Sequence, residues 1–108
     1  MNETKSVNGI CVRLEFISWA STFVGGDGNE RKFFDVEVPE GATLRDVLKK
    51  MSRRYRPLDE ALWHNGTGEL AEHLEIAVND ALMGIHHTLD SEMKEGDLVL
   101  LMGQYMGG

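Results

Sequence analysis

The sequence has little cysteine and no long apolar run. Its single cysteine, Cys11, excludes an internal disulfide and any zinc or iron–sulfur site built from cysteines. A reducing compartment is the simplest setting for such a chain. No apolar segment approaches the roughly 20 residues of a membrane span, and the polar start, Met1 to Gly9, lacks the apolar stretch of a signal peptide. We therefore expect a cytoplasmic protein.

Positive charge is also scarce. Eleven Lys and Arg residues stand against eighteen Asp and Glu residues, which gives a formal net charge of −7. This balance disfavours nucleic acid, because phosphates require a positive binding surface. It favours a soluble protein that is steered toward basic surfaces on a partner.

The length of 108 residues predicts one domain spanning 1–108, with a flexible C-terminal tail over 103–108. Folding at this size hides roughly two-thirds of the surface of the unfolded chain, enough for one core. The tail offers little apolar surface to offset the entropy lost on ordering, so we expect it to be mobile.

Two strands are predicted in the first part of the chain. Apolar residues alternate with polar ones from Ile10 to Phe16, which is typical of a strand with one buried face. The segment Trp19–Gly28 contains three glycines and is predicted to be a flexible loop. A second alternating strand follows over Arg31–Val38 and ends at the turn residues Pro39-Glu40-Gly41.

The clearest helix signal begins at Thr43. Thr43 and Asp46 have the spacing of a capping box. Apolar residues then follow with helical spacing, and Pro57 is expected to end the helix. The predicted apolar stripe is Leu44, Val47, Leu48, Met51 and Tyr55.

The second half of the chain predicts three more strands. Leu58–Glu72 is ambiguous, although Leu58 and Leu62 fit one helical turn. The strands are expected over Leu74–Val78, Ala81–Ile85 and Leu98–Met102, with turns at Asn79-Asp80 and Lys94–Asp97. Leu98–Met102 is continuously apolar, which is typical of a central strand covered on both sides.

This order of elements predicts an α+β fold in which helix and sheet share one core. The first and last strands are the most apolar and are expected to be neighbours in the middle of the sheet. The expected architecture is a β-grasp (ubiquitin-like) fold, a mixed sheet of four to five strands packed on one main helix.

No catalytic set emerges from the histidines or the cysteine. The histidines, at 64, 73, 86 and 87, have no carboxylate or cysteine at a spacing that builds a site, so no metal site is predicted. Adjacent residues of a strand point to opposite faces, so His86 and His87 could not grip one metal ion together. Cys11 lies on the polar face of its strand, and packing is the simpler role for it.

Two charged or glycine-rich segments also have structural explanations. Gly25-Gly26-Asp27-Gly28 lacks the lysine of a phosphate loop and precedes a strand. The basic run of Lys49, Lys50, Arg53, Arg54 and Arg56 is expected to be a solvated helix face, and docking of an acidic partner is the alternative.

The last residues are the most informative ones. The sequence finishes with Tyr105-Met106-Gly107-Gly108, shortly after the last predicted strand. With average glycine usage, a Gly-Gly pair at a given position is roughly a 1-in-200 event. A β-grasp domain whose last strand leads directly to Gly-Gly is rarer still.

Over Ile10–Gly108 the sequence resembles the ThiS/MoaD family of ubiquitin-like sulfur carriers. The resemblance depends on the order and spacing of five segments: Val12–Phe16, Val38–Leu48, Ile76–Asn79, Lys94–Val99 and Gly107-Gly108. It departs from the family where Asp80 replaces the usual glycine after Asn79, and where no proline precedes the Gly-Gly pair.

The resemblance implies a carrier and co-substrate, not an enzyme. In this family an E1-like adenylyltransferase (MoeB/ThiF type) adenylates the terminal carboxylate with ATP, and sulfur then replaces AMP to give a thiocarboxylate. The carboxylate of Gly108 would be the modified group, carried by a tail that includes Tyr105, Met106 and Gly107. ATP would be used by the activating enzyme, and no bound cofactor or metal is expected.

Several functions remain open for such a chain. The leading hypothesis is the small subunit of molybdopterin synthase in molybdenum cofactor biosynthesis, bound to a MoaE-type large subunit. Another sulfur acceptor, such as one for thiamine, is an alternative. A ubiquitin-like modifier joined to lysines through Gly108 is the rival from another class, and an interaction module with an inert tail is a third.

A carrier also needs a docking surface near its tail. We expect outward-facing residues of the first and last strands to supply it, with Ile17 and an alternate residue of Leu98–Met102, such as Leu101, as candidates. Burial in the core is the alternative for these residues.

Overall fold

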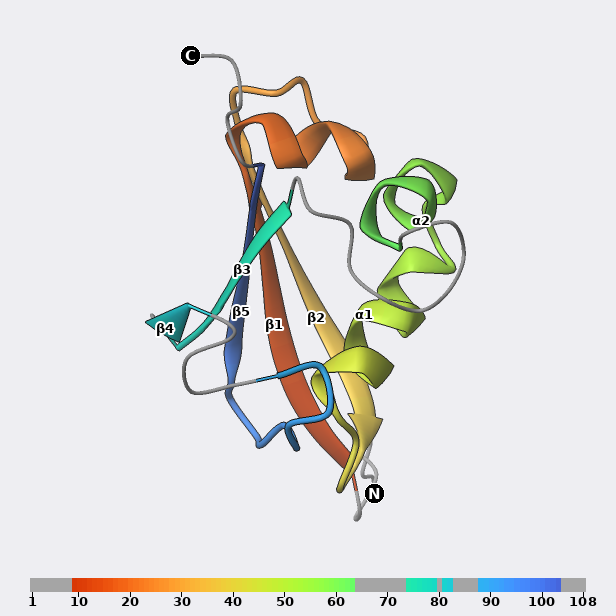
Figure 1. The fold of residues 1–108 in the computed structure, drawn as a ribbon, viewed down its shortest axis with the longest axis vertical. Helices are drawn as coiled ribbons and strands as arrows, with labels where there is room; N and C mark the ends of the chain where they lie inside the picture. Colours follow the sequence, from red (N-terminus) through yellow and green to blue (C-terminus); the bar gives the residue numbers. More distant parts are fainter. Residues whose placement is uncertain (1–8, 64–73, 80, 83–87, 104–108) are drawn as a thin grey trace, which may run out of the picture.

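The computed structural model describes residues 9–63, 74–79, 81–82 and 88–103 (Figure 1). Within them the chain forms five strands, two α-helices and one 3₁₀ helix. The elements in chain order are β1 (Gly9–Ile17), η1 (Ser18–Val24), β2 (Arg31–Pro39), α1 (Leu44–Ser52), α2 (Arg56–Leu62), β3 (Leu74–Val78), β4 (Ala81–Leu82) and β5 (Leu98–Gly103).

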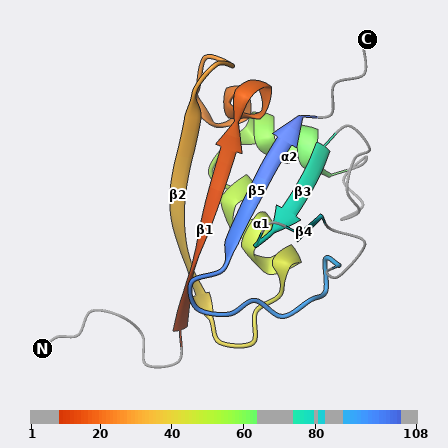
Figure 2. The ribbon, with the colours of Figure 1, turned by 90° about the vertical axis from the view of Figure 1, so that its left-hand side faces the viewer.

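The strands form one mixed sheet in the order β2-β1-β5-β3-β4. β1 pairs antiparallel with β2 and parallel with β5, and β3 pairs antiparallel with both β5 and β4. The first and last strands therefore lie side by side in the middle of the sheet (Figure 2), as the sequence predicts.

The core lies between the sheet and the helices, which cover one face of it (Figure 1). Alternate residues of β1, β2 and β5 point into this layer and meet the apolar stripe of α1. The largest completely buried side chains include Phe16, Leu14, Leu44, Leu48, Met51, Leu58, Leu62, Met93 and Leu101.

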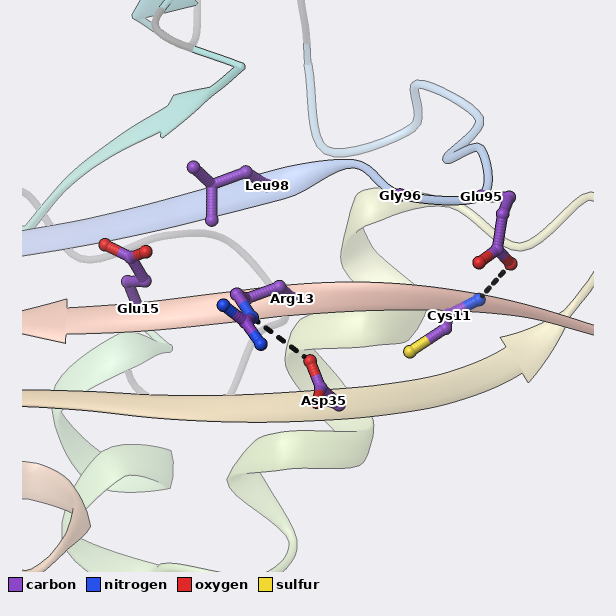
Figure 3. Close-up of a pocket in the computed structure, with 7 residues that line it drawn as sticks. All are labelled: Cys11, Arg13, Glu15, Asp35, Glu95, Gly96 and Leu98. Atoms are coloured by element: carbon purple, nitrogen blue, oxygen red, sulfur yellow. Dashed lines mark hydrogen bonds and ion pairs between the residues drawn. The ribbon is translucent and has the colours of Figure 1, made fainter.

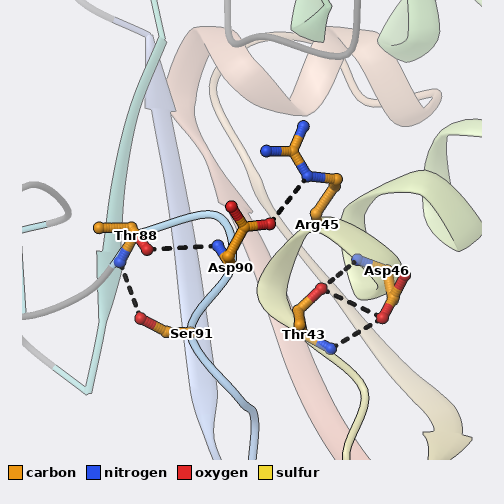
Figure 4. Close-up of polar contacts among 6 residues, drawn as sticks. All are labelled: Thr43, Arg45, Asp46, Thr88, Asp90 and Ser91. Atoms are coloured by element: carbon orange, nitrogen blue, oxygen red, sulfur yellow. Dashed lines mark hydrogen bonds and ion pairs between the residues drawn. The ribbon is translucent and has the colours of Figure 1, made fainter.

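The predicted capping box at the start of α1 is confirmed (Figure 4). The backbone N–H of Thr43 donates to Asp46 Oδ2 at 2.9 Å, and the backbone N–H of Asp46 donates to Thr43 Oγ1 at 3.2 Å. The next N–H groups, of Leu44 and Arg45, donate to the carbonyls of Ser91 and Leu89 at 2.9 and 2.8 Å. The first backbone N–H groups of any helix have no partner within the helix. Here two of them bind the segment before β5 and hold it against α1.

A second contact holds the same segment against α1. Arg45 Nε lies 3.2 Å from Asp90 Oδ1 (Figure 4). The backbone N–H of Thr88 donates to Ser91 Oγ at 2.9 Å, which closes the turn that carries Asp90. These contacts fix the position of the chain before it enters β5.

The prediction that α1 extends to Tyr55 and is ended by Pro57 is wrong. The helix ends at Ser52, Tyr55 is extended (φ −133°), and Pro57 lies in the first turn of α2. A proline in a helix interior would clash with the carbonyl four residues earlier, whereas in a first turn its missing N–H has no partner to lose. Pro57 therefore starts a helix, and the predicted turn containing Leu58 and Leu62 is part of α2.

The prediction of a loop over Trp19–Gly28 is wrong in its first half. Residues Ser18–Val24 form the 3₁₀ helix η1, which buries Ala20 and Val24. The glycines act only after it: Gly25 ends the helix with a φ of 89°, in the left-handed region that favours glycine.

The remaining turns agree with the prediction where they are described, and the strand ends agree to within one residue. Val78 pairs with Ala81, which confirms the two-residue hairpin connection, while residues 83–85 of the predicted fourth strand lie outside the described residues. The turn at Lys94–Asp97 is present, with the N–H of Asp97 donating to the carbonyl of Lys94 at 3.0 Å. Gly103 belongs to β5, where it pairs with Leu74, and not to the tail.

Within the described part of the chain, no helix has the length and apolar character that crossing a membrane requires.

Replacing Thr43 with alanine should lower the free energy of unfolding by about 1 kcal/mol, because it removes the side-chain acceptor of the capping box. Urea unfolding followed by circular dichroism measures the loss. Thr43→Ser keeps the hydroxyl and should retain most of the stability. Equal losses in the two variants would contradict a role for the cap.

Candidate functional site

None of the described helices covers the face of the sheet opposite the core, which we call the open face (Figure 2). The alternate residues of β1 and β5 that do not enter the core point to this face: Cys11, Arg13, Glu15 and Ile17 from β1, and Leu98, Leu100 and Met102 from β5. The expectation that β5 is covered on both sides is therefore wrong for the described residues. Its central place in the sheet comes from its two strand neighbours and not from a second layer.

Apolar side chains gather at one end of the open face. Glu15 pairs with both Phe33 and Leu100, and in the next row Ile17 pairs with Met102. Phe33 is 49% exposed, while Ile17, Leu100 and Met102 are half-buried. We call Ile17, Phe33, Leu100 and Met102 the open-face patch. It lies at the end of β5 from which the sequence continues to Gly107-Gly108.

The two docking candidates predicted from the sequence lie on opposite faces. Ile17 is at the end of β1 beside Met102, on the open face. Leu101 has no exposed surface and packs in the core, which is the alternative we considered for it. Because β1 and β5 are in parallel register, Leu101 pairs with the buried Phe16, and its docking role is withdrawn.

Phe33 is the member of the patch that the sequence analysis missed. Phe34, Val36 and Val38 share the core face of β2, so the preceding Phe33 falls on the other face by alternation. A large aromatic residue on the polar face of a predicted strand was the available signal.

The predicted tail residues, Tyr105, Met106, Gly107 and Gly108, lie outside the described residues, and so do all four histidines. The described chain ends with Gly103, which is paired in the sheet. From there the sequence continues for five residues to Gly108. Fully extended, five residues span roughly 17 Å.

The other end of the open face is polar and contains a shallow pocket of about 350 Å³ (Figure 3). Its polar groups are largely engaged with one another. Arg13 Nε lies 3.2 Å from Asp35 Oδ1, and the Glu95 carboxylate accepts the backbone N–H of Cys11 at 2.8 Å. The Arg13 guanidinium also lies over the Phe33 ring, 5.4 Å from its centroid, and so joins this pocket to the open-face patch.

Among the described residues, the open face offers an apolar contact surface. Cys11 is half-buried beside the Glu95 carboxylate, which already accepts a backbone hydrogen bond. Among the residues that the structure describes, no group of three or more His, Cys, Asp and Glu side chains could hold a metal ion. An apolar patch beside an Arg–Asp pair is typical of a protein-binding surface.

No family model and no curated protein sequence matches the chain, but solved structures do. The Haloferax volcanii HVO 2177 protein has a TM-score of 0.74 at 20% identity, covering 99% of this chain and 94% of that one. A putative molybdopterin converting factor subunit 1 from Pyrococcus furiosus has a TM-score of 0.67 at 24% identity, with coverages of 89% and 99%. SAMP1 from Haloferax volcanii has a TM-score of 0.72 at 19% identity, with coverages of 91% and 99%.

These similarities confirm the predicted β-grasp fold. It is shared with a putative molybdopterin converting factor subunit and with an archaeal modifier protein, and it is the fold that the resemblance to ThiS/MoaD carriers implies. A fold by itself does not fix a function. The function must therefore be argued from the open face and the C-terminal sequence.

Adjacent leucines of β5 provide a matched test of which face is core. Leu101→Ala should lower the free energy of unfolding by about 2–5 kcal/mol, because it leaves a cavity in the core. Leu100→Ala removes the same atoms from the half-buried open face and should cost only about 1 kcal/mol. Denaturant unfolding of both variants gives the comparison, and equal losses would contradict the assignment of the faces.

Proposed function

We propose that this protein is a ubiquitin-like sulfur carrier that acts in the cytoplasm through the carboxylate of Gly108. The observation that carries the proposal is the place of β5. The last strand lies in the centre of a β-grasp sheet and ends at Gly103, five residues before the end of the Gly107-Gly108 pair. A Gly-Gly pair so close to a fixed central strand can be presented to the active site of another protein.

The proposed chemistry needs no catalytic side chain on this chain. The carboxylate of Gly108 attacks the α-phosphate of ATP on an E1-like activating enzyme, and pyrophosphate leaves. The resulting acyl adenylate is a reactive electrophile. Hydrosulfide from a donor attacks its carbonyl carbon and AMP leaves, which gives the thiocarboxylate with no change of oxidation state. The sulfur is then a nucleophile at the tip of the tail and can be transferred to an acceptor.

Glycine at both final positions suits this chemistry. Without a Cβ atom, Gly107 and Gly108 fit a narrow cleft and adopt backbone angles that other residues resist. The roughly 17 Å span of five extended residues is long enough to enter a neighbouring active site while β5 stays in the sheet.

The open-face patch is the proposed docking surface for the activating enzyme and for the acceptor. It is apolar, it is uncovered by the described helices, and it lies at the end of β5 nearest the tail. Within the carrier class, we propose that the acceptor is a MoaE-type large subunit of molybdopterin synthase. This choice rests on the sequence resemblance, and the fold of the Pyrococcus furiosus protein is in keeping with it.

A ubiquitin-like modifier is the second candidate, because the fold is at least as similar to SAMP1, a small archaeal modifier protein, as to the converting factor subunit. In that function the carbonyl of Gly108 would be joined to lysines of target proteins. Affinity isolation from native cells separates the two functions. A single large-subunit partner supports the carrier, and a ladder of conjugates supports the modifier.

Deleting Gly108 should abolish modification and leave stability nearly unchanged. The deletion displaces the terminal carboxylate by about 3.5 Å, roughly one residue of extended chain, and reacting atoms must approach to about 3–3.5 Å. Intact-protein mass spectrometry after incubation with ATP, an E1-like enzyme and a sulfur donor measures the product. Wild type should gain the mass of one oxygen-to-sulfur exchange.

Two results of this assay would count against the proposal. One is modification of the deletion variant as efficiently as wild type. The other is a wild-type chain that stays unmodified with the activating enzyme of its own organism. Thermal unfolding of both chains shows that a lost product does not reflect lost folding.

Placing a charge in the open-face patch should weaken complex formation and leave the domain folded. Met102→Asp introduces a carboxylate where a partner would cover it, and we expect at least a roughly tenfold loss of affinity for the activating enzyme. Met102→Leu keeps an apolar side chain and should bind nearly as wild type. Calorimetric titration measures the affinity, and equal binding by the two variants would remove the patch from the interface.

A further inference from the structure

The positive charges of the described chain fall mainly into two groups. Five of the ten described cations lie within 4.0 Å of a carboxylate: Arg13, Arg31, Lys32, Arg45 and Arg56. Lys94, in the turn before β5, is exposed and lies apart from the rest. The four on the second half of α1 and just after it, Lys49, Lys50, Arg53 and Arg54, form no ion pair with any residue that the structure describes. In a chain of net charge −7, unneutralised positive charge is thus concentrated on one helix.

The fold itself keeps Lys49 and Lys50 from pairing with the carboxylate of Asp46 on their own helix. Asp46 is one turn before Lys49 and Lys50, the spacing at which a helical ion pair forms. Its carboxylate is instead taken up by the capping box, where Oδ2 accepts from the backbone N–H and hydroxyl of Thr43 at 2.9 and 3.1 Å. The same interaction that starts the helix leaves the lysines unpaired.

Two of the four side chains are nevertheless held in place. Lys50 Nζ donates to the backbone carbonyl of Glu37, and Lys49 Nζ lies over the Trp63 ring at 5.8 Å from its centroid. The carbonyl and the ring carry no net charge, so these contacts orient the ammonium groups without neutralising them. An ordered cation loses less side-chain entropy when a ligand binds.

The held lysines and Arg53 surround a surface pocket of about 410 Å³ between α1 and the end of β2. Its remaining lining is the buried Val38 and Ala42, the exposed Pro39, and Asp46, whose carboxylate is engaged with Thr43 in the capping box. We call Lys49, Lys50 and Arg53 the basic rim. The pocket combines an apolar floor with a positive edge. Because α1 lies on the helical side of the sheet (Figure 1), the pocket is away from the open-face patch.

The helix dipole alone does not account for this arrangement. Cations near a helix C-terminus are favoured by about 0.3–1 kcal/mol, which explains basic residues in the last turn. It does not require an apolar pocket beside them or side chains held by uncharged partners. An extended polyanion such as nucleic acid also fits poorly, because the exposed carboxylates Glu40, Asp59 and Glu60 lie on the segments that flank the rim.

We propose that the basic rim binds a short acidic segment of a partner protein, at a site separate from the proposed docking surface of the carrier. The spacing suits such a segment. Side chains three and four residues apart on a helix, as Lys50 and Lys49 are from Arg53, have Cβ atoms about 5–6 Å apart. Alternate residues of an extended peptide repeat every 6–7 Å or so, so alternate carboxylates match the rim and a small apolar residue between them faces the floor.

The proposal is independent of the chemistry at Gly108. The open-face patch and the basic rim lie on different sides of the sheet, so two different partners can bind these two surfaces at the same time. The acidic segment would then tether the protein, and the tail would remain available to its enzymes.

The probe for the test is the fluorescein-labelled peptide Glu-Ala-Glu-Leu-Glu, with Gln-Ala-Gln-Leu-Gln as its neutral control. Fluorescence anisotropy at low salt should show binding of the acidic peptide only, weakened by added salt because the rim is exposed. Arg53→Glu replaces attraction with repulsion and should weaken binding roughly tenfold. As a control, Lys94→Glu makes the same charge change at an exposed lysine outside the basic rim, in the turn before β5. It should change affinity less than about twofold.

The outcomes separate the proposal from its alternatives. Failure of the acidic peptide to bind, equal binding of the neutral peptide, or equal losses in Arg53→Glu and Lys94→Glu would each overturn it. Tighter binding of a single-stranded oligothymidylate that Arg53→Glu abolishes would assign the rim to nucleic acid and overturn it as well. Should Arg53→Glu fail to fold, Arg53→Gln removes the charge without reversing it, and an unchanged affinity there would also contradict the proposal.

Discussion

The parallel pairing of β1 with β5 is the contact on which the rest of the structure depends. It joins Arg13–Ile17 to Leu98–Met102, segments more than 80 residues apart, in the middle of the sheet. Closing so long a loop is entropically costly, and the burial of Leu14, Phe16, Val99 and Leu101 on one face offsets that cost. β3 has no place in the sheet until β5 is there, since it reaches β1 only through that strand.

The same pairing separates the two surfaces of the molecule. Because β1 and β5 run in parallel register, their inward residues meet the helices and their outward residues form one continuous open face. The helical side carries unneutralised positive charge, whereas the open face carries an apolar patch. The proposed carrier would meet several enzymes in turn, and two surfaces of different chemistry would let it bind different partners.

Local signals in the sequence predicted most of the fold. Alternation gave the faces of β1 and β2, and Thr43 with Asp46 marked the start of α1, because both depend on residues close in sequence. Pro57 was misinterpreted because a proline that ends one helix and a proline that begins the next have similar surroundings in sequence. The 3₁₀ helix η1 was not predicted because the glycines that follow it suggested a loop throughout.

The continuous apolar run of β5 could not reveal which face of the strand is covered, since that depends on where the helices lie. This explains why Leu101 was predicted at the surface.

The central claim is that the carboxylate of Gly108 carries sulfur, and it is tested most directly in the protein as its own cells make it. The protein would be purified from those cells, alkylated with iodoacetamide and digested, and the peptide ending in Gly107-Gly108 would be sequenced by tandem mass spectrometry. The account predicts a fraction of this peptide alkylated at a thiocarboxylate on Gly108. A peptide found only with an unmodified carboxylate, or only joined through Gly108 to lysines of other proteins, would contradict it.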